Sequence, residues 1–230
     1  MDWFNHFYAW ACERLYYEFA WSYDWVSWLV SLGAWSSWRR VALDYLQDTR
    51  NATPRVLELG FGTGELLLAL AQRDIQVYGL ELSPAMHKIT ATKLRNRGLK
   101  VNRVRALAQA LPFVEGSFDN IIATFPAPYI LQLDTLQECA RLLRKPQPAT
   151  GLQGGRLIIV GLWVAAESGN WRRYIPLFYG TPSEALLHHI QQRFAAAGLA
   201  VTITEQRTGS GWLGVVIGEA TAVTPRNTDH

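Results

Sequence analysis

From about residue 55 onward, hydrophobic residues fall in short runs that alternate with amphipathic stretches. This alternation is typical of a parallel β-sheet whose strands are connected by crossover helices. We predict strands at 55–59, 75–80, 101–106, 118–124, 155–161, 201–204 and 212–218, and helices at 65–73, 83–98, 133–143 and 181–198. Ser83 is placed to cap the second of these helices, and the segment 181–184 has the pattern of a capping box. Residues 146–154 contain two prolines and two glycines, so we expect a mobile surface loop there.

The first fifty residues differ in kind from the rest of the chain. They hold no glycine before Gly33, and seven of the ten tryptophans fall between Trp3 and Trp38. We predict helices at about 2–20, 25–31 and 35–47, followed by a turn that ends at Pro54. The sequence therefore divides into an N-terminal aromatic helical cap (1–50), a core domain (51–220) and a flexible tail (221–230).

Composition narrows the class of protein. Hydrophobic residues make up 49% of the 230 residues and charged residues 18%, which is typical of a folded domain. A net charge of +3 makes nucleic-acid binding an unfavoured interpretation. Cys12 and Cys139 have no neighbours at metal-ligand spacing, so we predict no metal site. Neither a signal peptide nor a run of about 20 apolar residues is present, and we expect a cytoplasmic protein with no transmembrane segment.

A glycine-rich turn is the most informative feature. A predicted buried strand leads into Gly60, Gly62 and Gly64, and a predicted helix follows. Glycines at these positions allow a tight turn and let a ligand approach the main chain closely. Glu81 follows at the end of the next strand, where a carboxylate can accept hydrogen bonds from both hydroxyls of a ribose. Together these features predict a site for a nucleoside-bearing cofactor.

The charges around the turn distinguish between two such cofactors. A dinucleotide site would need a small residue where Glu65 stands and an unobstructed place for the pyrophosphate. Here Glu65 and Glu58 flank the turn with carboxylates, which suit a cationic ligand better than an anionic one. S-adenosylmethionine carries a sulfonium and an ammonium group, so the turn favours that cofactor over NAD.

Four stretches of the chain resemble the class I S-adenosylmethionine-dependent methyltransferases, and the small-molecule and quinone- or lipid-type enzymes most of all. They are ELGFGTGE at 58–65, GLELSPAM at 79–86, LPF…GSFD at 111–119 and LLRKP…GGR at 142–156. The resemblance spans about residues 23–218. It implies a Rossmann-like, doubly wound α/β fold with a mostly parallel seven-stranded sheet, an antiparallel last strand and an N-terminal helical cap. It also implies methyl transfer to a small, apolar or lipid-like acceptor with release of S-adenosylhomocysteine.

The resemblance assigns cofactor contacts residue by residue. Glu58, Gly60, Gly62 and Gly64 would hold the methionine part, Glu81 the ribose, Leu82 and Met86 the faces of the adenine, Ala108 and Gln109 its edge, and Thr124 and Phe125 the methionine side. Leu107 departs from the family, which often has an acidic residue there for the adenine amino group. Residues 146–154 are an insertion in the family's usual turn.

The catalytic residues stay open at this stage. Residues 125–129 read Phe-Pro-Ala-Pro-Tyr, close to a motif that holds the target nitrogen in amino-group methyltransferases, but Thr124 and Phe125 replace its polar residue. The simpler interpretation is a rigid pocket wall with Tyr129 facing the substrate. His6 is a candidate base and Tyr23 a candidate polar contact. Methyl transfer from a sulfonium depends mainly on alignment, so an obvious base is not required.

The aromatic N-terminus permits three interpretations. Its helices pack on the sheet, contact a membrane surface peripherally, or form a lid over an apolar acceptor. Aromatic residues occur on both helix faces, and a membrane helix usually carries a basic polar face that this segment lacks, so we favour the lid. Two alternatives to the small-molecule enzyme also remain, namely an RNA or protein methyltransferase and a non-catalytic S-adenosylmethionine-binding protein.

Overall fold

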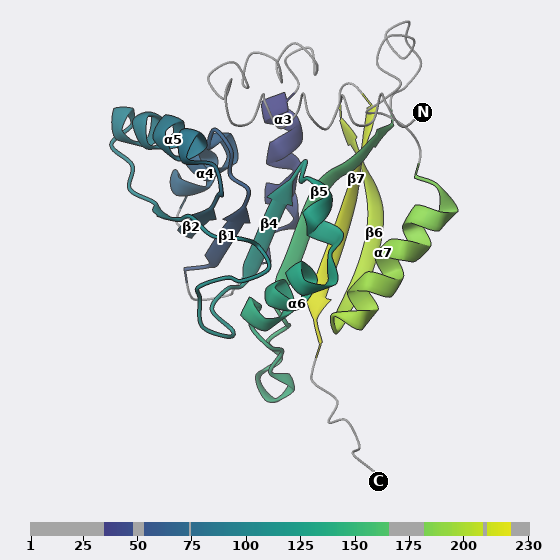
Figure 1. Ribbon diagram of the computed structural model, residues 1–230. Coiled ribbons are helices and arrows are strands. Elements are labelled where there is room, and N and C mark those ends of the chain that lie inside the picture. The colour runs from purple at the N-terminus through teal and green to yellow at the C-terminus, as the bar shows by residue number, and fades with distance from the viewer. Residues whose placement is uncertain (1–34, 48–52, 74, 166–181, 209–210, 222–230) are drawn as a thin grey trace, which may run out of the picture.

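The chain forms a seven-stranded sheet with helices on both faces, as a computed structural model shows for residues 35–47, 53–73, 75–165, 182–208 and 211–221 (Figure 1). The strands are β1 (Arg55–Leu59), β2 (Gln76–Leu80), β3 (Asn102–Val104), β4 (Asn120–Thr124), β5 (Arg156–Ala165), β6 (Leu199–Thr208) and β7 (Gly211–Ala220). Their spatial order is β3-β2-β1-β4-β5-β7-β6, with β7 antiparallel to both of its neighbours. The predicted doubly wound fold with an antiparallel last strand is confirmed.

The order of the strands places a ligand site near β1. The chain moves outward from β1 to β2 and β3, then returns to place β4 on the other side of β1. Ligands of open α/β sheets bind beyond the carboxyl ends of the strands at such a reversal. Leu59 pairs in register with Leu80 of β2 and with Ala123 of β4, so the ends of these three strands lie at one edge.

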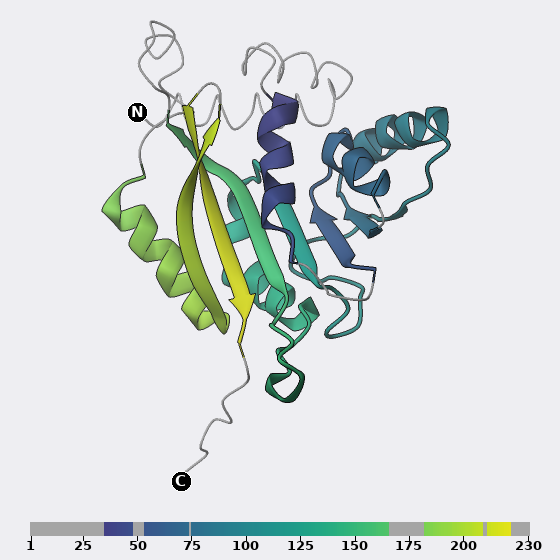
Figure 2. The ribbon, with the colours of Figure 1, turned by 180° about the vertical axis from the view of Figure 1, so that it is seen from behind.

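Different helices cover the two faces of the sheet. Figure 2 shows α3 lying across one face, and Figure 1 shows α6 and α7 on the other. Strand residues alternate between the faces, so Leu57 and Leu59 join the core under α6 and α7, whereas Val56 joins the core under α3 and α4. The helical elements are α3 (Trp35–Arg40) continued by η2 (Val41–Tyr45), α4 (Glu65–Ala71), α5 (Pro84–Asn96), η3 (Pro128–Leu131), α6 (Leu133–Leu142), η4 (Pro148–Thr150) and α7 (Glu184–Ala196).

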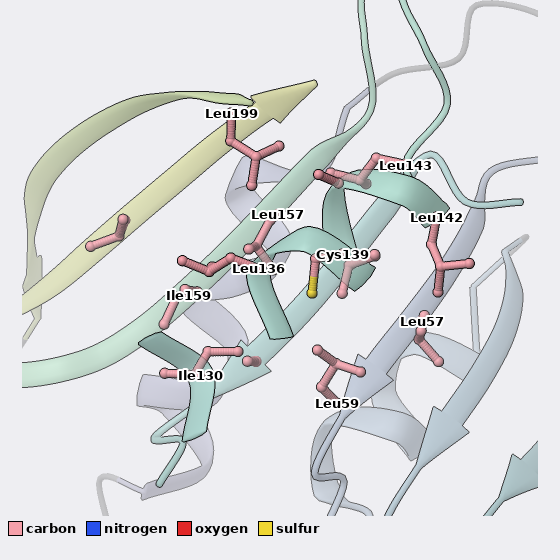
Figure 3. Packing of buried hydrophobic residues seen from close by; sticks show 14 of the residues in the cluster. Leu57, Leu59, Ile130, Leu136, Cys139, Leu142, Leu143, Leu157, Ile159 and Leu199 are labelled. Atoms are coloured by element: carbon pink, nitrogen blue, oxygen red, sulfur yellow. The ribbon is translucent and has the colours of Figure 1, made fainter. Parts of the chain in front are cut away.

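The core under α6 is closely packed and apolar. Leu136 and Cys139 of α6 project toward Leu57, Leu59 and their neighbours on the sheet, as Figure 3 shows. Burial raises the pKa of the Cys139 thiol to about 12. Cys139 therefore acts as a small hydrophobic side chain and not as a nucleophile.

Several predicted boundaries need correction. The last two strands are ten residues each, longer than predicted, and the strand predicted at 101–106 is limited to Asn102–Val104. The helix predicted at 35–47 is a short α-helix that tightens into a 3-10 helix at Val41. Ser183 is the N-cap of α7 and accepts a hydrogen bond from Leu186 N, so this helix begins later than the predicted capping box placed it. The helices predicted at 2–20 and 25–31 lie outside the described residues.

Candidate functional site

The glycine turn after β1 has the left-handed backbone that its sequence requires. Gly60, Gly62 and Gly64 have φ angles of 68°, 52° and 81°, which side chains other than glycine rarely tolerate. Gly60 N and Phe61 N donate to Leu80 O, so the turn is closed against the end of β2. A Cβ on Gly64 would lie 2.5 Å from Thr90 Cγ2. The turn thus needs its glycines both for conformation and for space.

Glu81 holds this turn from the neighbouring strand. Its side chain is buried, and its Oε2 accepts a hydrogen bond from Gly62 N at 3.0 Å while its Oε1 accepts one from Ser83 N at 2.8 Å. Each carboxylate oxygen can accept more than one hydrogen bond. Glu81 therefore has a structural role that its sequence position did not reveal, in addition to the predicted role at the ribose.

Helix α5 supports the turn from behind. Thr90 Oγ1 donates to Gly62 O at 3.0 Å, and the His87 ring makes an edge contact with Phe61. His87 Nε2 lies 2.9 Å from Glu81 O, so this half-buried histidine fastens the segment between β2 and α5. Arg103 and Arg105 of the β3 region donate to His87 O and Leu82 O. The segment that carries Glu81 is thus held from both sides.

Glu58 is a buried carboxyl group next to the turn. Desolvation, opposed by the nearby Arg39 guanidinium and assisted by Glu81, raises the pKa of Glu58 to about 8. Among the described residues, no hydrogen-bond donor reaches its Oε2. A buried, incompletely bonded carboxyl group beside a glycine turn is suited to a cationic ligand.

The raised pKa of Glu58 predicts a specific pH dependence of stability. In the folded state this carboxyl binds a proton more tightly than in the unfolded state, where its pKa is near 4.5. The free energy of unfolding should therefore fall as pH rises from about 5 to about 8 and then level off, at about 1.4 kcal/mol for each pKa unit of difference. Replacing Glu58 with Gln should remove this loss, as urea unfolding at several pH values would measure.

Glu138 offers a control for this measurement. Its hydrogen bond and charge interaction with Arg141 lower its pKa, so its contribution to stability is lost only in acid. Glu138→Gln should keep the wild-type pH dependence between pH 6 and 8. If Glu58→Gln kept it as well, Glu58 would not be the group responsible.

Phe125 follows β4 in an unusual backbone conformation. Its φ of 48° is the one positive value found for a non-glycine residue in the described part of the chain. Phe125 N donates to Val160 O at 2.7 Å, and its ring lies over Gly161, where β5 bulges. The same ring is 6.0 Å from the Trp38 ring of α3. Strained residues fixed in this way often mark functional sites, and this one lies where the sheet places a ligand.

Tyr129 reaches the glycine turn from the opposite face. A Cβ on Gly60 would lie 2.9 Å from the Tyr129 hydroxyl, so this oxygen occupies the space that the glycine leaves. Burial, reinforced by the charge of Glu81, raises the pKa of Tyr129 well above its ordinary value. The hydroxyl therefore keeps its proton at neutral pH and serves as a hydrogen-bond donor and not as a base.

The other residues predicted to contact the cofactor differ in how far they are exposed to solvent. Thr124 and Ala108 are buried, Leu82 is 39% exposed and Gln109 bonds to Gln132. Met86 is fully buried, so its side chain forms part of the protein interior. Leu107, where the family often has an acid, is 54% exposed.

The expectation that Glu65 adds negative charge beside the turn was wrong. Glu65 forms an ion pair with Lys93 of α5 at 2.9 Å, so it does not add a free negative charge beside the turn. Glu81 remains to provide that charge, and Glu58, with its pKa raised to about 8, provides it once it loses its proton. Sequence reasoning also missed Trp38, Arg39 and Thr90, because nothing in their local pattern connects them with a turn that lies far along the chain. His6 and Tyr23, the other catalytic candidates, lie outside the described residues.

Comparison with known proteins agrees with this geometry. Residues 56–146 match the family profile described as "Methyltransferase domain". A demethylmenaquinone methyltransferase from Thermus thermophilus is 39% identical over 113 residues, which cover 48% of this chain and 50% of that protein. The ubiquinone/menaquinone biosynthesis C-methyltransferase UbiE of Serratia proteamaculans is 33% identical over 152 residues, covering 64% and 57%. This chain thus matches little more than half the length of these relatives.

A solved structure shows the same fold. The geranyl diphosphate C-methyltransferase of Streptomyces coelicolor, in a complex that includes S-adenosyl-L-homocysteine, superposes with a TM-score of 0.57 at 16% identity, covering 80% of this chain and 79% of that one. Within the described part of this chain, no helix has the length and apolarity needed to cross a membrane. The same residues contain no group of three or more His, Cys, Asp or Glu side chains arranged for a metal ion.

Proposed function

Since residues 56–146 match the methyltransferase-domain family, we propose that this chain is a class I S-adenosylmethionine-dependent methyltransferase that transfers a methyl group from that cofactor to a small, apolar acceptor of the quinone type. One observation carries the proposal. The glycine turn between β1 and α4 is closed against a buried Glu81 at the point where the order of the strands reverses. The relatives named as quinone methyltransferases support the choice of acceptor class.

The residues at this site fit the cofactor chemically. Glu58 offers a buried carboxylate oxygen, without a donor among the described residues, to a cationic group. Glu81 offers its carboxylate oxygens to the ribose hydroxyls, and the three glycines leave the backbone accessible. The buried Glu81 carboxylate beside the turn disfavours the pyrophosphate of a dinucleotide. S-adenosylmethionine, when bound, supplies an electrophilic methyl group on a sulfonium.

The protein's contribution to the reaction is mainly to align the acceptor and to exclude water. Phe125 and Thr124 stand at the end of β4, beside the methionine side of the site, and Phe125 is locked by its bond to Val160 O. Tyr129 keeps its proton and donates a hydrogen bond to a polar atom of the acceptor or cofactor. Alignment of nucleophile, methyl carbon and sulfur supplies much of the acceleration in such a transfer.

In this proposal, the N-terminal cap covers the methyl acceptor. Residues 1–34 are outside the described region, and their many aromatic residues suit a lid over an apolar quinone ring. Tyr8, Tyr17 and Tyr23 are the candidate polar contacts. We propose a cytoplasmic enzyme, and a peripheral contact between this segment and a membrane surface is the alternative to the lid.

Calorimetry and a product assay test the proposed function. S-adenosylhomocysteine should bind and, at about 100 times its Kd, raise the free energy of unfolding by about 2.7 kcal/mol, whereas NAD should not bind. A demethylated menaquinol analogue should gain 14 Da by mass spectrometry with the full chain. The chain without residues 1–22 should bind S-adenosylhomocysteine more weakly and methylate nothing.

Each result of this experiment has a definite meaning. Micromolar binding of NAD without S-adenosylhomocysteine binding would overturn the cofactor assignment. Binding of S-adenosylhomocysteine with methylation of RNA or protein, and none of any quinol, would favour the alternative enzyme. Full activity of the truncated chain would refute the lid.

A further inference from the structure

The stretch from Leu82 to Val114 is strongly basic. It contains seven lysine and arginine residues and no aspartate or glutamate, whereas the rest of the chain holds fifteen basic and nineteen acidic residues. The net charge of +3 therefore combines one basic segment with a chain that is otherwise slightly acidic. The segment includes α5 and β3, and β3 is the strand at one edge of the sheet. Figure 1 shows α5 on one side of the molecule and α7 on the opposite side.

An open hollow of about 390 Å³, which we call the basic hollow, lies between the end of α5 and β3. Its lining combines apolar and cationic side chains, namely Leu94, Leu99 and Val101 together with Arg95, Lys100 and Arg103. Arg95 and Lys100 are exposed, and none of the residues that line the hollow is acidic. The hollow thus offers apolar surface beside three positive charges.

The fold does not compensate these charges. In the described part of the chain, Lys93 is the one basic residue of the stretch that forms an ion pair, with Glu65 of α4. Cations are favoured in the last turn of a helix, which accounts for Arg95, but Lys100 and Arg103 lie beyond the end of α5. Like charges gathered on one surface repel one another, and an anionic partner would remove that repulsion.

Exposed apolar side chains occur in the same stretch. The large hydrophobic side chains that are exposed in the described residues are Leu82, Leu107 and Val114. Arg103 and Arg105 donate to His87 O and Leu82 O, so basic side chains continue from the hollow to the first of these leucines. Basic and apolar groups side by side, without acidic groups, are typical of a surface that meets an anionic membrane.

We propose that the basic hollow binds the phosphate groups of anionic phospholipids and so holds the protein against a bilayer. Arg95, Lys100 and Arg103 contact the phosphates through charge-assisted hydrogen bonds, and the apolar lining faces the glycerol and the first carbons of the lipid chains. RNA is the competing polyanion, but its bases stack on aromatic side chains, and no aromatic residue lines the hollow. The choice of a bilayer rests on the proposed function, because a small, apolar acceptor partitions into hydrocarbon.

Vesicle sedimentation with the full chain tests the proposal. The protein should bind phosphatidylcholine vesicles that contain about 30% phosphatidylglycerol about tenfold more strongly than vesicles of phosphatidylcholine alone. Arg95→Gln/Lys100→Gln should lower the partition coefficient on the anionic vesicles about tenfold, because each cation near an anionic surface contributes to binding. Both side chains are exposed, so this double variant should fold and keep the wild-type affinity for S-adenosylhomocysteine.

Arg193→Gln/Arg207→Gln is the matched control. It removes the same charge from α7 and from β6, the strand at the opposite edge of the sheet, and should change the partition coefficient less than about twofold. Equal losses in the two double variants, or equal binding of the wild type to both kinds of vesicle, would overturn the proposal. Binding of polyuridylate in place of vesicles, lost in Arg95→Gln/Lys100→Gln, would assign the hollow to nucleic acid instead. The proposed function is tested separately, by methylation of the quinol analogue in solution without vesicles.

Discussion

Glu81→Gln is expected to weaken S-adenosylhomocysteine binding at least tenfold and to destabilise the protein by about 1–3 kcal/mol. The carboxylate accepts hydrogen bonds from both Gly62 N and Ser83 N, and an amide has only one oxygen to offer them. One buried N–H would then face the amide nitrogen of glutamine, another donor. The glycine turn should loosen at the same time as the ribose loses an acceptor. Calorimetry and urea unfolding would measure the two effects separately.

Glu205→Gln is the control for this prediction. Glu205 is an exposed residue of β6, at the far edge of the sheet from β2, and it accepts a hydrogen bond from Trp163 Nε1 of β5. Its amide counterpart keeps an acceptor oxygen, so stability and cofactor affinity should both stay near wild type. An unchanged Kd in Glu81→Gln would show that Glu81 only supports the turn and does not contact the cofactor.

The features that could be predicted from the sequence are those that neighbouring residues determine. The buried strand, the glycines and the acidic residue at the next strand end lie within 26 residues of one another, from Val56 to Glu81, and each has a conformational reason that can be stated without a structure. Ser83 and Pro84 mark the start of α5 in the same way, and the cap is present, with Met86 N donating to Ser83 Oγ.

The features that sequence reasoning missed depend on contacts between distant segments. Nothing in the local pattern of α3 shows that Arg39 is buried, because an arginine in a polar and aromatic stretch ordinarily projects into solvent. Glu65 was interpreted as a free charge because its partner, Lys93, is 28 residues away on another helix. Strand β6 is longer than predicted because its second part, residues 205–208, is polar and exposed or half-exposed, and its pairing with β7 extends it.

Gly161→Ala is expected to reduce methyl transfer at least tenfold while lowering stability by only about 1–3 kcal/mol. Gly161 has a φ of 84° in the bulge of β5, and an added Cβ would lie 2.4 Å from Phe125 Cε1. The Phe125 ring is able to move, so the clash should displace that ring and should not unfold the chain. A misplacement of about 1 Å beside reacting groups can lower a rate a hundredfold.

Gly98→Ala separates the effect of backbone strain from the effect of the displaced ring. Gly98 has a φ of 67° at the end of α5, and nothing lies within 4 Å of a Cβ placed there. This variant should lose about 1–2 kcal/mol of stability from the left-handed backbone alone and keep the wild-type rate of methyl transfer. Equal rates in the two variants would mean that Phe125 does not position the reacting groups. A rate loss confined to Gly161→Ala, with S-adenosylhomocysteine affinity nearly retained, would place Phe125 beside the methyl group and its acceptor.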